Sequence, residues 1–66
     1  MSKLLVQRTI REWRLDRRFK QDTLAKEIGV TKQTISNWET GRFWPTGAYL
    51  QALCSALRIG IEEIQF

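Results

Sequence analysis

Residues 31–39 read TKQTISNWE, and this stretch decides how the rest of the chain is interpreted. Thr31 is a good helix N-cap, because its hydroxyl can accept a hydrogen bond from a backbone N–H left unpaired at a helix start. At 100° per residue, Thr31, Ile35 and Trp38 fall on one side of the helix that follows. The spacing therefore predicts a helix that begins near Lys32 and packs through this side.

The other side of the same helix carries polar side chains that have no apolar surface to cover. They are Gln33, Ser36, Asn37 and Thr40, with Lys32 beside them near the helix start. A cation in the first turn is opposed by the helix dipole at a cost of about 0.3 to 1 kcal/mol, unless an anion lies nearby. Amides suit adenine edges and lysine suits guanine, so we expect this face to contact DNA.

Length and composition fit a single small helical domain. The chain has 66 residues, of which 42% are hydrophobic, enough for one core within one domain, residues 1–66. It has no run of 18 apolar residues and no signal-like segment, so we expect a cytoplasmic protein without membrane contact. There is one cysteine and no histidine, and no paired-carboxylate arrangement stands out. We therefore expect no enzymatic activity, metal, cofactor or small-molecule substrate.

The net charge of +4 is unevenly distributed along the chain. Residues 1–44 carry ten of the eleven basic side chains and five of the seven acids, whereas residues 45–66 are one unit negative. The basic part therefore contains TKQTISNWE, as a surface for a polyanion requires. On charge alone, a solvated charged face without a nucleic-acid partner is an equal alternative.

Upstream, the sequence predicts an amphipathic helix over roughly residues 3–17, which Ser2 could cap. Its stripe consists of Val6, Ile10, Trp13 and Arg17. Leu4 and Leu5 lie off the stripe and could belong to an arm or to a subunit contact.

Arg14 lies at the edge of this stripe, so it is expected to be partly buried and to need an acid. Glu39 lies at the margin of the inward face of residues 31–39, and we predict that the two residues pair. The alternative is two independent surface charges.

Between these segments, residues 21–28 predict a short second helix with Leu24, Ala25 and Ile28 on its apolar side. Gly29 should end it, because glycine tolerates the positive φ that often follows a helix. The small side chain of Ala25 allows this helix to cross the first one closely. Phe19, in the connection, is expected to point inward.

The pattern Gln21-x-x-Leu24-Ala25-x-x-Ile28-Gly29-Val30-Thr31-x-x-x-Ile35-Ser36-x-Trp38-Glu39-x-Gly41 resembles the helix-turn-helix of the lambda-repressor-like, Cro/CI-type DNA-binding family. Upstream, Arg14 matches the family arginine that pairs with the glutamate at Glu39. Downstream, residues 41–45 match the family, followed by Leu50, Leu53, Leu57, Ile59, Ile61 and Ile64. The resemblance covers roughly residues 8–65. It implies a compact all-α fold of five helices, with the helix-turn-helix at helices two and three.

The C-terminal third is expected to supply helices four and five. Thr46 can cap a helix over residues 47–57. Its apolar stripe is predicted to be Tyr49, Leu50, Leu53, Cys54 and Leu57, with Cys54 as a small buried filler, not a reactive thiol. IEEIQF then predicts a short last helix in which Ile61 and Ile64 pack inward. Phe66, together with Leu4 or Leu5, is a candidate dimer contact, although terminal aromatics often lie on the surface.

The resemblance also implies a role for individual residues. Base contacts are expected from Lys32, Gln33 and Asn37. Contacts to the DNA backbone are expected from Gln21, Thr34, Ser36 and Arg42. The residues themselves, apart from the resemblance, add Lys20, Thr40 and Trp44 as backbone contacts. Gln21 would also brace the recognition helix. Alternatively, Phe43 or Trp44 covers the core.

The chain departs from the family pattern at three helix ends. Arg18 stands where glycine is frequent, Lys20 where Ser or Thr caps the second helix, and Gly60 where Ser usually caps the last one. Each departure weakens a helix end by about 1 kcal/mol.

These expectations together predict a sequence-specific DNA-binding transcriptional regulator. A Cro-like repressor or a small controller protein fits best, acting as a homodimer on double-stranded DNA with a pseudo-palindromic operator. One alternative is an antitoxin-like or adaptor protein that uses the fold mainly to hold a protein partner. Another is the DNA-binding fragment of a longer repressor.

Overall fold

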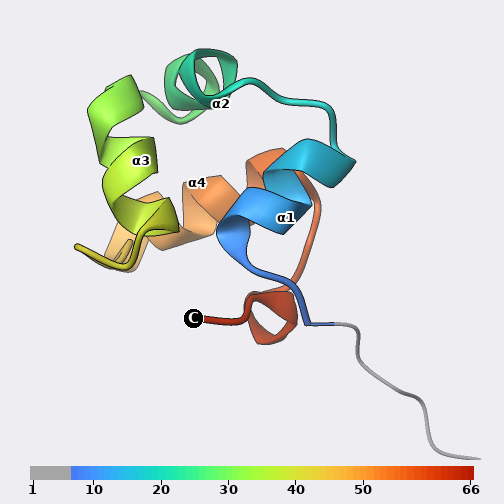
Figure 1. Ribbon diagram of the computed structural model, residues 1–66. Coiled ribbons are helices and arrows are strands. Elements are labelled where there is room, and N and C mark those ends of the chain that lie inside the picture. Colours follow the sequence, from blue (N-terminus) through green and yellow to red (C-terminus); the bar gives the residue numbers. More distant parts are fainter. Residues whose placement is uncertain (1–6) are drawn as a thin grey trace, which may run out of the picture.

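The computed structural model describes residues 7–66, which form an all-α unit (Figure 1). Its elements are α1 (Ile10–Asp16), α2 (Gln21–Ile28), α3 (Lys32–Glu39), α4 (Gly47–Leu57) and the 3₁₀ turn η1 (Ile61–Glu63). The expected five helices are thus four α-helices and one short turn in the described part of the chain. The chain returns to an extended conformation at Ile64 (φ −94°, ψ 128°), so no fifth α-helix can propagate. None of the helices in residues 7–66 has the length and apolar character needed to cross a bilayer.

The first helix starts later than predicted, because Thr9 and Glu12 form a capping box. The Glu12 N–H donates to the Thr9 hydroxyl at 3.2 Å, and the Thr9 N–H donates to Glu12 Oε1 at 2.8 Å. Arg8 precedes this cap and forms a parallel bridge with Ile64. The predicted helical conformation of residues 7–9 is therefore wrong. Predictions for residues 1–6, including the Ser2 cap and the roles of Val6, Leu4 and Leu5, lie outside the described residues.

The turn between α2 and α3 follows the sequence prediction closely. Gly29 ends α2 in the left-handed region (φ 89°), and the N–H groups of Gly29 and Val30 both donate to Ala25 O, at 2.8 and 2.9 Å. Two residues later the Thr31 hydroxyl accepts from the Thr34 N–H at 3.1 Å and starts α3. Three consecutive residues thus set the angle between the two helices.

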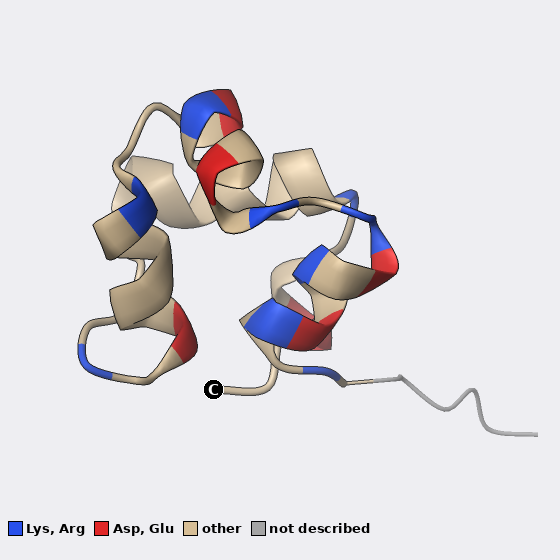
Figure 2. Ribbon diagram, turned by 45° about the horizontal axis from the view of Figure 1, so that its top comes forward, with Lys and Arg blue, Asp and Glu red and all other residues tan. Residues whose placement is uncertain are grey.

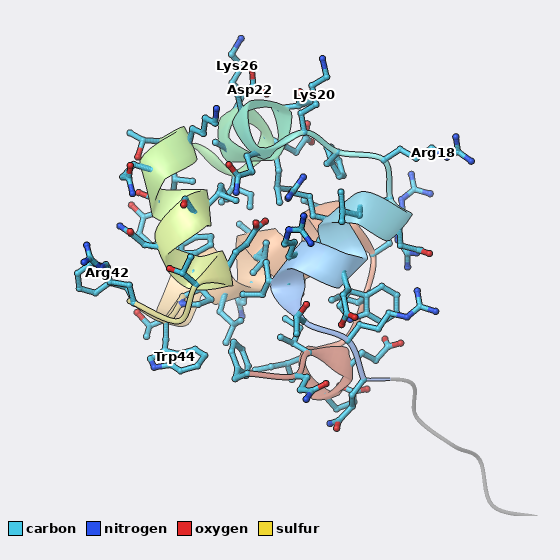
Figure 3. The ribbon with its side chains drawn as sticks, viewed as in Figure 1. Arg18, Lys20, Asp22, Lys26, Arg42 and Trp44 are labelled. Atoms are coloured by element: carbon cyan, nitrogen blue, oxygen red, sulfur yellow. The ribbon has the colours of Figure 1, made fainter. Side chains whose placement is uncertain are left out.

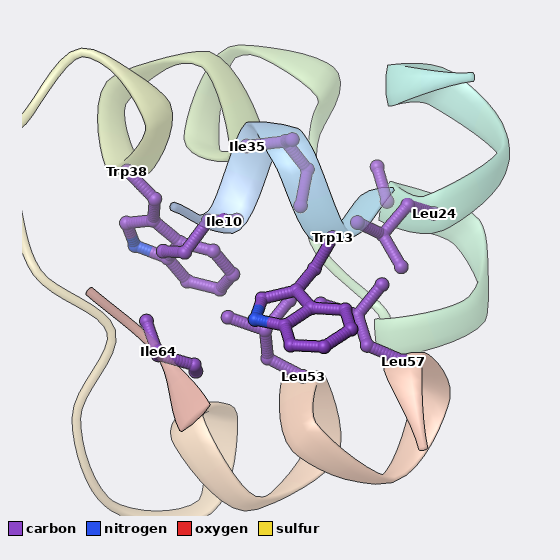
Figure 4. Close-up of a cluster of buried hydrophobic side chains, with 9 residues drawn as sticks. Ile10, Trp13, Leu24, Ile35, Trp38, Leu53, Leu57 and Ile64 are labelled. Carbon is purple, nitrogen blue, oxygen red and sulfur yellow. The ribbon is translucent and has the colours of Figure 1, made fainter. Parts of the chain in front are cut away.

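The core lies between the helices and receives a buried side chain from each α-helix (Figure 4). Its members are Ile10, Trp13, Leu24, Ala25, Ile35, Trp38, Leu53, Leu57 and Ile64. Phe19, Ile28 and Val30 are partly buried and pack against this cluster. Burial of these apolar surfaces supplies most of the free energy that favours the folded state.

In the C-terminal third, fewer side chains are buried in the core than the sequence predicts. Tyr49 is 53% exposed and Ile61 is 54% exposed, so both inward assignments are wrong. Tyr49 lies in the first turn of α4 and reaches the core only at its rim, where its ring centroid is 6.5 Å from that of Trp38. Ile61 and Ile64 do not share one helical face, since the chain leaves the helical conformation between them.

Cys54 lies on α4 beside the core and is half-buried, not fully buried as predicted. Burial, together with the nearby carboxylate of Glu62, raises the pKa of its thiol. A raised pKa keeps the sulfur protonated and unreactive near neutral pH, in agreement with a packing role.

Trp13 joins the beginning of the described chain to its end. Its indole Nε1–H donates to Glu63 O at 2.7 Å, and the guanidinium groups of Arg8 and Arg17 each lie 5.0 Å from the ring centroid. Asp16 accepts from both arginines, at 3.1 Å from Arg8 and 2.5 Å from Arg17. These contacts hold the C-terminal turn against α1.

Candidate nucleic-acid interface

Helix α3 presents one buried and one polar side, as the spacing of TKQTISNWE predicts. Ile35 is fully buried and Trp38 is 6% exposed, whereas Lys32 and Gln33 are exposed. The partly exposed residues Thr34, Ser36 and Asn37 lie beside them, and Thr40 at the helix end is exposed. Thr31, predicted on the packing side, is exposed because its hydroxyl serves the helix cap.

The polar side chains of α3 are ordered by hydrogen bonds to one another. Gln33 Nε2 donates to Asn37 Oδ1 at 3.1 Å, one helical turn further on. The Thr31 and Thr34 hydroxyls lie 2.9 Å apart. The backbone carbonyl of Asn37 accepts from the N–H groups of Arg42 and Phe43 at 2.9 and 3.3 Å, which fixes the loop to the end of the helix.

A buried ion pair supports α3 from behind. The pair predicted between Arg14 and Glu39 is present: Arg14 Nε lies 2.5 Å from Glu39 Oε2, and the side chains are 8% and 3% exposed. Arg14 Nη2 donates to Glu39 Oε1 at 3.3 Å, and Nη1 donates to Phe19 O at 2.9 Å. Gln21 Nε2 also donates to Glu39 Oε1, at 2.9 Å. Glu39 therefore ties the last residue of α3 to α1 and to the start of α2.

Basic residues lie at the starts of α2 and α3, where the ribbon is blue in Figure 2. Lys20, Gln21 and Lys32 line one open hollow, together with Arg11, Arg14 and Asp22. Arg11 is an exposed basic residue that the sequence reasoning did not single out. Its spacing of three residues from Arg14 was the available signal, since it places the two arginines on neighbouring positions of α1.

A second basic position lies at the other end of α3. Figure 3 shows Arg42 projecting from the loop after this helix, while Lys20 and Lys26 project near α2. Arg42 is exposed and follows Gly41, whose φ of 79° turns the chain away from the helix. The polar face of α3 thus has basic side chains near both of its ends.

The aromatic side chains of the same loop lie at the surface. Phe43 is 59% exposed and Trp44 is 53% exposed, so neither ring is buried. Trp44 instead contacts Phe66 edge-on, with ring centroids 5.2 Å apart and planes inclined by 77°. Phe66 is 56% exposed. The two rings form an exposed aromatic pair.

Comparisons with known proteins give two similarities that cover this geometry. The family model described as helix-turn-helix matches residues 10–64, which include α1 to α4 and η1. Among solved structures, the P22 c2 repressor protein in complex with a synthetic operator has a TM-score of 0.75 and 37% sequence identity, and the alignment covers 77% of each chain. The comparison with curated proteins found no match.

Proposed function

We propose that this chain, which belongs to the lambda-repressor-like, Cro/CI-type helix-turn-helix family of DNA-binding transcription regulators, is a sequence-specific repressor that binds its operator as a homodimer. A Cro-like repressor or a small controller protein in the cytoplasm fits these features. The observation that carries the proposal is the polar side of α3, held outward by the buried Ile35 and Trp38 and buttressed through Glu39. The operator in the P22 c2 repressor complex supports double-stranded DNA as the ligand.

The proposed readout uses the first part of α3 in the major groove. N-terminal residues of a recognition helix contact base edges, and Lys32 and Gln33 are exposed there. A lysine suits guanine O6 and N7, and an amide suits adenine N6 and N7. Lys32, Gln33 and Asn37 are therefore the proposed sequence-reading group.

The proposed backbone contacts fix the register of the protein without reading sequence. Lys20 and Gln21 would bind phosphate near the start of α3, with Arg11 as an additional donor from α1. Arg42 and the Trp44 indole N–H would bind near the end of α3. The partly exposed Thr34 and Ser36 and the exposed Thr40 complete the proposed set.

The size of the interface and the symmetry of operators support the proposed homodimer. One such domain covers only about 600 to 1,000 Å² of DNA-contacting surface, which limits its affinity for a single half-site. Two copies related by a twofold axis would bind half-sites about one helical turn apart. The exposed Trp44 and Phe66 rings support this edge as a candidate subunit contact.

Binding measurements with duplex DNA test the proposal. The chain should enrich a pseudo-palindromic site from random duplexes, and its affinity should fall steeply as salt is raised, because bound phosphates release counterions. An antitoxin-like or adaptor protein would show neither selectivity nor this salt dependence. A DNA-binding fragment of a longer repressor would still enrich a site, but with weaker dimerisation. Absence of any enriched sequence would contradict the proposed function.

Arg42→Gln gives a second test, because it removes the positive charge of one proposed phosphate contact and keeps a polar side chain. Affinity should fall for all sequences alike, and the slope of log K against log salt should become shallower by about 1. Arg58→Gln is the matched control, since it removes the same charge from the end of α4. Equal effects of the two substitutions would show that Arg42 acts only through net charge.

A further inference from the structure

Two amide side chains on α3 are already bonded to each other in the structure without DNA. Gln33 and Asn37 are four residues apart, so their side chains lie on neighbouring turns of the same face. Gln33 Nε2 donates to Asn37 Oδ1 at 3.1 Å. Two side chains that were each assigned a base contact are thus coupled before any base is present.

The two amides differ in reach and in support. Gln33 is exposed in the first turn of α3, and its side chain is one methylene longer than that of asparagine. Asn37 is half-buried near the helix end, and its backbone carbonyl accepts hydrogen bonds from the backbone N–H groups of Arg42 and Phe43. Because base contacts are made mainly by the N-terminal residues of a recognition helix, Gln33 is placed to touch a base. Asn37 is placed to fix the orientation of the Gln33 side chain through their hydrogen bond.

We infer that Gln33 and Asn37 read one base pair as a unit, in which Gln33 contacts adenine and Asn37 positions Gln33. An amide nitrogen carries two hydrogens, and one of those on Gln33 is given to Asn37. The remaining N–H and Oε1 form the donor and acceptor pair that matches adenine N7 and N6. The bond to Asn37 also restricts a long side chain before binding, which lowers the entropy lost on contact with the base.

This inference rests on the proposed function and assigns a base preference to one part of the same site. Its test begins with selection of a duplex site from random DNA by the wild-type chain. Dissociation constants are then measured for the wild type, Gln33→Ala, Asn37→Ala and the double variant. Each protein is tested on the selected duplex and on every single base-pair change of it.

Both single substitutions should relax the preference at the same A·T pair, each by about 5- to 100-fold. The double variant should lose no more discrimination than Gln33→Ala alone, because Asn37 acts through Gln33. If the two substitutions relax different base pairs and their losses multiply, Gln33 and Asn37 read independently and the inference is wrong. If the wild-type chain selects no site, the proposed function fails and the inference fails with it.

Asn37→Asp separates positioning from direct contact. Aspartate keeps an oxygen that accepts from Gln33 but lacks the amide N–H donors of asparagine. The variant should therefore retain the preference for the A·T pair, while its added negative charge weakens binding to all duplexes. Loss of the preference, as in Asn37→Ala, would overturn the positioning role. Melting temperatures close to that of the wild type verify that these surface variants are folded.

Discussion

Arg14 and Glu39 place two charges where the rest of the interior is apolar. Their mutual contact, the Phe19 carbonyl and the Gln21 amide satisfy both groups, and no described buried side-chain polar atom lacks a hydrogen-bond partner. Such a pair is a weak source of net stability, because desolvation offsets the attraction. Its strong effect is on geometry, since Glu39 fixes the end of the helix proposed to read DNA.

Arg14→Ala or Glu39→Ala should each lower the free energy of unfolding by about 3 to 5 kcal/mol, because either leaves a buried charge unpaired. This is a large share of the roughly 5 to 15 kcal/mol that stabilises a typical domain. The double variant Arg14→Met/Glu39→Leu should cost clearly less than the sum of the two single variants. Urea denaturation measures all three, and additive losses would contradict the coupling.

At Arg18 the backbone conformation itself affects the stability of the fold. Its φ of 63° lies in the left-handed region, at a position where the family resemblance already marked glycine as frequent. Arg18→Gly should therefore raise the free energy of unfolding by up to about 1 kcal/mol. Lys26→Gly, an exposed basic position inside α2, should lower it by about 1 kcal/mol in the same thermal-melting series. Shifts of the same sign would refute the role of the backbone angle.

At the scale of the elements, local signals made α2 and α3 predictable and left the start of α1 ambiguous. Gly29 and Thr31 are strong stop and start signals, and both helices have the predicted bounds. The capping box of Thr9 and Glu12 lies inside an apolar repeat that continues upstream, so the repeat hid the true start. The periodicity of Tyr49 and Ile61 was visible, but their exposure depends on what the tertiary fold places beside them.

The candidate site was predictable to a similar extent. The polar face of α3 follows from helical spacing, and the Arg14–Glu39 pair follows from the need of a partly buried arginine for an acid. Arg11 joins the basic hollow only because α1 crosses near the starts of α2 and α3. The bond from Gln33 to Asn37 depends on the rotamers of both side chains, which the sequence does not specify.

The start of α1 should show a pH-dependent contribution to stability. The hydrogen bond from the Thr9 backbone N–H, followed by that of its hydroxyl, lowers the pKa of Glu12 below its usual value. Ionised Glu12 therefore stabilises the fold above its usual pKa, and this contribution is lost as pH falls through the lowered pKa. The difference in unfolding free energy between the wild type and Glu12→Ala should shrink over that acidic range. A difference independent of pH would contradict this account.

Thr9→Ala provides the companion measurement, because it removes the hydroxyl and keeps the backbone N–H that Glu12 accepts from. It should lower the free energy of unfolding by about 0.5 to 2 kcal/mol at neutral pH. Most of the pH-dependent contribution of Glu12 to the free energy of unfolding should remain in this variant. Thr9→Ser should restore most of the lost stability.

Across the whole molecule, segments distant in sequence support the C-terminal end of α3 and the loop that follows it. The Arg14, Gln21 and Glu39 contacts connect it to α1 and α2, while the exposed Trp44 and Phe66 rings place the loop after α3 beside the C-terminal residues. The proposed reading residues lie on α3, and the basic side chains lie on this helix and on the segments next to it. The shape of the domain therefore positions the proposed site.

The parallel bridge between Arg8 and Ile64 joins the first described residues to the C-terminal segment. The nearby bond from Gln7 Nε2 to Glu62 O joins residues 55 positions apart in sequence, whereas the turn from α2 to α3 is local. Closing a segment of this length costs more conformational entropy than forming the local turn between α2 and α3. This junction should therefore open in small fluctuations that leave α2 and α3 intact. Native-state hydrogen exchange should find the Gln65 amide, which donates to Arg8 O, less protected than that of Ile35. Opening of this junction would then leave the proposed DNA contacts of α3 in place.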